Sequence, residues 1–135
     1  MKKTPLDILT ILYKLLFASS LKTAITGSVY KQKRPTGSVL EDVVVNSLPV
    51  SGDQLQRGAG NVNIYVPDLL ETVAGTELRI VDTARLKVLA ELAVPLLTEF
   101  NCQQYRFWLG PTDVFEEPDT GQTYLNFRIE FQFFP

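Results

Sequence analysis

The chain has 135 residues, 45% of them hydrophobic and 21% charged, which is ordinary for one soluble globular domain and argues against a disordered chain. The net charge of -2 predicts neither a nucleic-acid nor a membrane partner, and histidine is absent. The single cysteine, Cys102, excludes an internal disulfide, and without histidine neither Ser–His nor Cys–His catalysis is possible. We expect one domain over residues 1–135, with no metal or cofactor and no enzymatic activity.

The charges are unevenly distributed along the chain. Residues 1–34 carry seven basic side chains and one acidic side chain, whereas residues 35–135 carry six basic and fourteen acidic ones. The simplest interpretation is a solvated basic surface. The alternative is a basic patch that attracts the acidic part of a neighbouring copy.

The first expected element is a helix over residues 5–19. Thr4 is a suitable N-cap, Pro5 suits the first helical position, and Asp7 lies near the positive end of the helix dipole. The helix is apolar on most sides, which predicts one face on its own sheet and another against a second subunit. The segment loosely resembles a signal peptide, but its apolar stretch is too short to span a bilayer, so a cytoplasmic protein is the default.

Three strands are expected next, at residues 23–31, 39–47 and 61–66. The last two form a hairpin whose tip is a long flexible loop over residues 49–60. Residues 67–75 are expected to contain a short helical turn that ends at Gly75.

A second long helix is expected to start at Asp82–Thr83, with apolar residues at spacings of three and four, and Pro95 is expected to kink or divide it. Residues 104–134 then predict a hairpin of two strands around the turn at 118–121. Its second strand alternates clearly between apolar and polar residues. The expected fold class is α+β, with a mostly antiparallel sheet of about five strands and two long helices packed on one face.

Several groups of residues resemble functional sites, but each has a simpler structural interpretation. Glu116, Glu117 and Asp119 favour a solvated acidic turn over a cation site, and Cys102 favours packing over reactivity. Gly58 and Gly60 favour a flexible loop over a phosphate cradle, because phosphate loops lead into a helix. The basic segment "KQKRP" favours a solvated turn over a nucleic-acid contact.

The order of these segments resembles the tail terminator, or tail-completion, proteins of long-tailed bacteriophages and prophages. The likeness is one of layout and covers nearly the whole chain. The segments that carry it are "TPLDILTILYKLL", "DVVVNSL", "NVNIYVPD", "ARLKVLAELAVPLLTEF" and the closing hairpin "YRFWL…NFRIEF".

The resemblance implies a non-enzymatic structural protein that forms a ring, commonly a hexamer, at the head-proximal end of the tail tube. The ring would stop tube growth and dock to the head connector. It would not recognise a specific nucleic acid or bind a membrane. It would be found in the host cytoplasm during assembly and in the tail of the mature virion. The expected interface residues are Lys31, Lys33 and Arg34 in the basic segment "KQKRP", and Asp53, Gln54, Gln56 and Arg57 in the long loop.

Two alternatives remain open at this point. The chain could be another phage structural component, such as a head-completion, neck or baseplate subunit. It could also be a small binding module that holds an apolar ligand between sheet and helices, in a pocket lined by Phe107, Trp108, Phe127 and Phe131.

Overall fold

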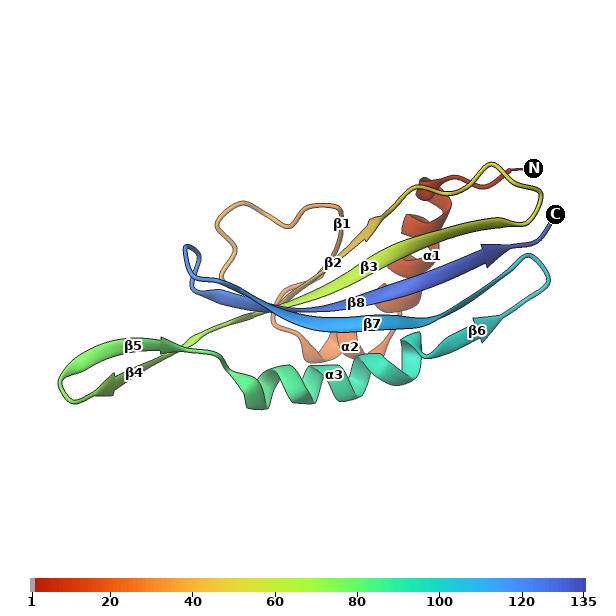
Figure 1. Cartoon of the computed structure of the whole chain (residues 1–135). Helices are drawn as coiled ribbons and strands as arrows, with labels where there is room; N and C mark the ends of the chain where they lie inside the picture. The colour runs from red at the N-terminus through yellow and green to blue at the C-terminus, as the bar shows by residue number, and fades with distance from the viewer. Residues whose placement is uncertain (1) are drawn as a thin grey trace.

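A computed structural model describes residues 2–135 and places three helices and eight strands there (Figure 1). The helices are α1 (Pro5–Phe17), α2 (Ser20–Ala24) and α3 (Thr83–Leu97). The strands are β1 (Val29–Lys31), β2 (Asp42–Ser47), β3 (Gln56–Pro67), β4 (Leu69–Val73), β5 (Thr76–Ile80), β6 (Glu99–Asn101), β7 (Tyr105–Glu117) and β8 (Gln122–Phe133).

The strands form two sheets. The larger has six strands in the order β1-β2-β3-β8-β7-β6, and the smaller is the two-stranded β4–β5 hairpin. Within the larger sheet β1 is parallel to β2, and the other neighbours are antiparallel. The expected α+β fold, a sheet of about five strands with two long helices packed on one face, is therefore wrong. The structure is mostly β, with 44% of the residues in strands and only 25% in helices.

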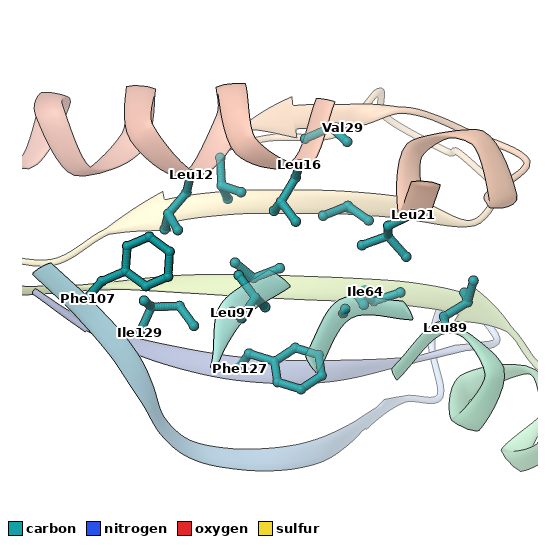
Figure 2. Packing of buried hydrophobic residues seen from close by; sticks show 14 of the residues in the cluster. Leu12, Leu16, Leu21, Val29, Ile64, Leu89, Leu97, Phe107, Phe127 and Ile129 are labelled. Atoms are coloured by element: carbon teal, nitrogen blue, oxygen red, sulfur yellow. The ribbon is translucent and has the colours of Figure 1, made fainter. Parts of the chain in front are cut away.

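The hydrophobic core lies between one face of the larger sheet and the helices (Figure 2). The register pairs Val62 with Phe127 and Ile64 with Leu125, so alternate residues of β3 and β8 point into the core together. On the helix side, Leu12 and Leu16 of α1 and Leu89 and Leu97 of α3 are fully buried.

The expected strand over residues 23–31 is wrong for most of its length. The chain forms α2 first, and only Val29–Lys31 pair with β2. Leu21 and Ile25, four residues apart, are both buried in the core. A spacing of four residues suits one turn of helix, and the short helix α2 with its C-cap residue Ile25 places both side chains in the core.

The expected long loop at residues 49–60 is wrong in its second half, because β3 begins at Gln56. Gly58 and Gly60 lie in this strand and face α1: a Cβ at Gly60 would lie 2.7 Å from Leu12 Cδ1 and 2.9 Å from Ile8 Cγ2. The two glycines therefore permit close packing of the helix on the strand, and they do not belong to a flexible tip.

The predicted helix over residues 5–19 is confirmed at its start, and α1 ends two residues earlier than expected, at Phe17. Thr4 Oγ1 accepts from the Leu6 N–H at 3.2 Å, and Asp7 Oδ2 accepts from the Thr4 N–H at 2.8 Å. The α3 prediction is confirmed in its start, because Asp82 is the N-cap, but the helix is not divided at Pro95 and ends at Leu97. The closing hairpin is also confirmed as β7 and β8.

Candidate interaction surfaces

The β4–β5 hairpin projects from one end of the molecule, away from the helices and the larger sheet (Figure 1). The sequence prediction of a helical turn at 67–75 is wrong here. Ala74 (φ 52°) and Gly75 (φ 79°) form a two-residue turn of left-handed backbone between Val73 and Thr76, which pair across the strands. Every residue of both strands is exposed.

The two faces of the hairpin differ in character. The cross-strand pairs Leu69–Ile80, Glu71–Leu78 and Val73–Thr76 place four large apolar side chains and one carboxylate on one face, called here the apolar hairpin face. Its four apolar residues are exposed by 37–50%. The opposite face carries Leu70, Thr72, Glu77 and Arg79. Within residues 2–135 no other element covers the apolar hairpin face.

The hairpin is held to the body at its base. The Asp68 N–H donates to the Gly121 carbonyl at 2.9 Å, and Thr123 Oγ1 donates to Asp68 Oδ1 at 2.8 Å. The Arg79 guanidinium lies against Gly121 in the β7–β8 turn, in space that a Cβ at this position would enter. These contacts set the direction of the hairpin and leave the rest of its length free for another partner.

An apolar groove lies between α1 and the strands β6 and β7. It has a volume of about 500 Å³ and is lined by Thr10, Ile11, Lys14, Leu15, Phe100, Tyr105 and Phe107. A second hollow of about 320 Å³ extends it along α1 towards Lys3, and the two share three lining residues. We call the two together the α1–β7 groove.

One wall of the α1–β7 groove is an aromatic cluster. The Phe100 ring lies 5.6 Å from the Phe107 ring and 5.7 Å from the Tyr105 ring, between centroids. Burial raises the pKa of the Tyr105 hydroxyl above its ordinary value. The groove thus offers apolar surface with a single cation, Lys14, in the lining of its larger part.

The face of the sheet opposite the core carries polar and aromatic rows. Tyr65 and Tyr124 have ring centroids 4.9 Å apart, Phe115 lies 5.2 Å from Tyr124, and the Arg34 guanidinium lies 4.3 Å above the Tyr65 ring. Burial, and then the charge of Glu117, raise the pKa of the Tyr65 hydroxyl. A row of asparagines on neighbouring strands is joined by side-chain hydrogen bonds; its members are Asn46, Asn61, Asn63 and Asn126.

Arg34, predicted from the sequence as an interface residue, is occupied within its own chain. Its guanidinium pairs with the fully buried Asp42 carboxylate at 2.8–2.9 Å and donates to the Leu40 carbonyl at 2.9 Å and to Gln122 Oε1. These bonds tie the segment between β1 and β2 onto the sheet, beside a pocket of about 400 Å³ that Arg34 itself lines. The arrangement favours a structural role for Arg34.

Lys31 and Lys33 are both exposed, as a partner contact would require. The Lys31 ammonium lies 5.0 Å above the Tyr13 ring, a contact that leaves its charge near the surface. These two lysines are the members of the predicted basic cluster whose charge is free of a carboxylate among the described residues.

The four predicted residues from the loop have different surroundings. Asp53, Gln54 and Arg57 are exposed, whereas Gln56 is only 5% exposed. Gln56 Oε1 accepts a hydrogen bond from the Lys3 N–H at 2.8 Å. Gln56 Nε2 donates to the Lys3 carbonyl at 3.0 Å and to the Ser51 carbonyl at 2.8 Å. It thus holds the N-terminal segment against the loop.

The structure does not bring the two predicted groups together. The loop over residues 48–55 lies near the chain termini, whereas the loop between β1 and β2 lies towards the other end of the sheet (Figure 1). The structure brings together three of the four aromatic residues proposed for a ligand pocket. Phe107, Phe127 and Phe131 are buried in the core, with the Phe107 and Phe131 rings 5.4 Å apart between centroids, so they fill space rather than line a pocket between sheet and helices. Trp108 lies on the opposite face of the sheet, with Arg106 4.8 Å from its ring.

Sequence reasoning missed the two surfaces described first, the apolar hairpin face and the α1–β7 groove. The hairpin has a sequence signal, because "LLETV" and "TELRI" flank the dipeptide Ala74–Gly75. The groove has none, because its lining comes from α1, β6 and β7 together.

Across residues 2–135, no group of three or more metal-ligating side chains lies close enough to hold a metal ion. The helices of the same residues include none that is long and apolar enough to cross a membrane. No protein-family model matches the sequence, and no curated protein matches it either.

Proposed function

We propose that this chain is a non-enzymatic structural subunit that assembles head to tail with copies of itself. The observation that carries this proposal is the projecting β4–β5 hairpin, whose Leu69, Val73, Leu78 and Ile80 side chains share one exposed face. A two-stranded hairpin is marginally stable in water, and packing against another protein supplies the missing layer.

The arrangement of the molecule favours head-to-tail contacts. The hairpin lies at one end of the long axis, and β6 with the chain termini lies at the other (Figure 1). A subunit with two different contact surfaces at opposite ends associates heterologously, and such contacts close into a ring when the rotation between copies allows it.

The resemblance to phage tail terminators supports a specific form of this proposal. In that form the subunits make a ring at the head-proximal end of a phage or prophage tail tube, with the tube and the head connector as partners. Assembly takes place in the host cytoplasm, and the ring is part of the virion tail. Lys31 and Lys33 contact acidic residues of a neighbouring subunit. Arg34 does not take part in this contact, because it is paired with Asp42 of its own chain.

The proposal is tested by the mass of the protein in solution. Light scattering after size-exclusion chromatography, at micromolar to millimolar concentration and at two salt concentrations, is expected to give one discrete multimer for the wild type. Leu78→Asp places a charge on the apolar hairpin face and should give monomers. The matched control is Leu70→Asp, the same change on the opposite hairpin face, which should assemble as the wild type does.

Two results would contradict self-assembly through the hairpin. One is a wild-type monomer over the whole concentration range. The other is a Leu78→Asp variant that assembles as well as the wild type does. Replacing both Lys31 and Lys33 by Glu tests the electrostatic part, and an unchanged mass and salt response would remove that part alone.

A further inference from the structure

We infer that the α1–β7 groove receives the apolar hairpin face of a neighbouring copy, with Glu71 of one copy paired to Lys14 of the next. This inference rests on the proposed self-assembly and adds which two surfaces meet. It makes the occupant of the groove a second copy of this chain.

The two surfaces match in chemistry. The apolar hairpin face presents four aliphatic side chains, and the groove presents aliphatic and aromatic side chains from α1, β6 and β7. Removal of both surfaces from water is favourable in proportion to the apolar area that they bury. The hairpin is a two-stranded ribbon, and the groove is open along α1 because its two hollows adjoin.

The two surfaces also match in charge. Glu71 is the single charged residue on the apolar hairpin face, where Leu78 lies opposite it. Lys14 is the single charged residue in the lining of the groove's larger part, between Ile11 and Leu15 on α1. A charge placed within an apolar surface is costly to bury unless it meets an opposite charge, so this pair fixes the register of the contact.

The contact cannot form within one copy. The hairpin leaves the sheet at the end opposite to β6 (Figure 1). Asp68 at its base is hydrogen-bonded to Gly121 in the β7–β8 turn and to Thr123 at the start of β8. The groove of the same copy is therefore out of reach, whereas a neighbour displaced along the long axis presents its groove directly. Each copy then donates one hairpin and accepts one, as a ring requires.

Cysteine cross-linking tests this contact. In a Cys102→Ser background, Glu71→Cys and Lys14→Cys are combined in one chain and oxidised with copper–phenanthroline. Head-to-tail docking is expected to give a ladder of covalent multimers beyond the dimer on non-reducing gels. The matched control combines Thr72→Cys with Lys14→Cys, because Thr72 is the next residue on the opposite hairpin face and should give at least fivefold less product.

A charge exchange gives a second measurement on the folded, non-cross-linked protein. Glu71→Lys and Lys14→Glu should each weaken assembly about fivefold or more, because like charges then meet in the contact. The double variant should recover the wild-type affinity. Both residues are exposed in the monomer, so circular dichroism and thermal unfolding of the variants are expected to match the wild type.

The outcomes separate this inference from the proposed function. Two results would overturn the groove as the receptor and leave self-assembly intact, provided that the wild type is multimeric. One is that Glu71→Cys with Lys14→Cys gives no cross-link. The other is that the Thr72 control cross-links equally well. Cross-linking that stops at the dimer would support the docking and contradict the head-to-tail arrangement. A single charge variant that assembles normally would overturn the Glu71–Lys14 pairing.

Discussion

The strands β3 and β4 are almost one continuous run of extended chain, separated by Asp68 alone, yet their surroundings are opposite. In β3 the alternate residues Val62, Ile64 and Val66 are at most 2% exposed, because β2 and β8 pair with the strand and helices cover its face. In β4 every residue is exposed. Alternation thus identifies a face that needs a cover, but the cover itself comes from elsewhere in the fold or from another molecule.

The largest expected effect contrasts one leucine from each region. Leu12→Ala removes a fully buried side chain that packs over Gly60 of β3, and should lower the free energy of unfolding by about 2–5 kcal/mol. Leu78→Ala in the hairpin should change it by no more than about 0.5 kcal/mol in the monomer. Urea unfolding monitored by circular dichroism, at a protein concentration low enough to keep the protein monomeric, compares the two. Equal losses would show that the hairpin is covered within the monomer.

The next effect contrasts two neighbouring cations. Arg34→Met leaves the buried Asp42 carboxylate without its ion pair and should lower the free energy of unfolding by about 3 kcal/mol. Lys33→Met, one residue away and exposed, should leave stability within about 0.5 kcal/mol of the wild type. Thermal unfolding compares the midpoint temperatures of the two variants. Equal midpoints would refute the structural role of Arg34.

A smaller effect is expected from two glutamines near the start of β3, one in the strand and one in the loop before it. Gln56→Ala leaves the backbone groups of Lys3 and Ser51 without their amide partner, and should cost about 1–3 kcal/mol. Gln54→Ala, in the exposed loop, should cost less than about 0.5 kcal/mol. Amide hydrogen exchange at Lys3 should rise only in the first variant; a rise in neither would place the N-terminal segment outside the cooperative unit.

The smallest effect is a dependence on alkaline pH. Burial raises the pKa of Tyr65 above 10.0, so above that pH the unfolded chain releases a proton that the folded chain retains. Stability is therefore unaffected by this group at neutral pH and falls as the pH rises above about 10. Tyr65→Phe should flatten that fall in urea unfolding between pH 9 and 11, and an unchanged slope would rule out Tyr65 as its source.

Local chemistry explains which elements were predictable. The start of α1 depends on Thr4, Pro5 and Asp7, which act within one turn, and the alternation of Phe127 to Phe133 is legible without the rest of the chain. The hairpin at 69–80 was also encoded locally. Its interpretation as a helical turn failed because Gly75 suits a helix end as well as a hairpin turn.

The interface residues divide in the same way. Exposure of Lys31, Lys33, Asp53, Gln54 and Arg57 agrees with their polar character. Arg34 and Gln56 have equally polar side chains, yet both are held by groups distant in sequence: Gln122 for the first, and Lys3 for the second. The identity of a side chain sets what bonds it can make, while the fold decides whether a partner within the chain already makes them.

The sequence by itself determined the absence of histidine, the capped start of α1, the start of α3 after Asp82 and the closing pair of strands. Only the tertiary structure decided the parallel pairing of β1 with β2, the burial of α2, and the glycine contacts under α1. It also decided that the β4–β5 hairpin stays uncovered. Caps and periodicity act between residues a few positions apart, whereas pairing and burial depend on distant segments, whose meeting no local pattern specifies.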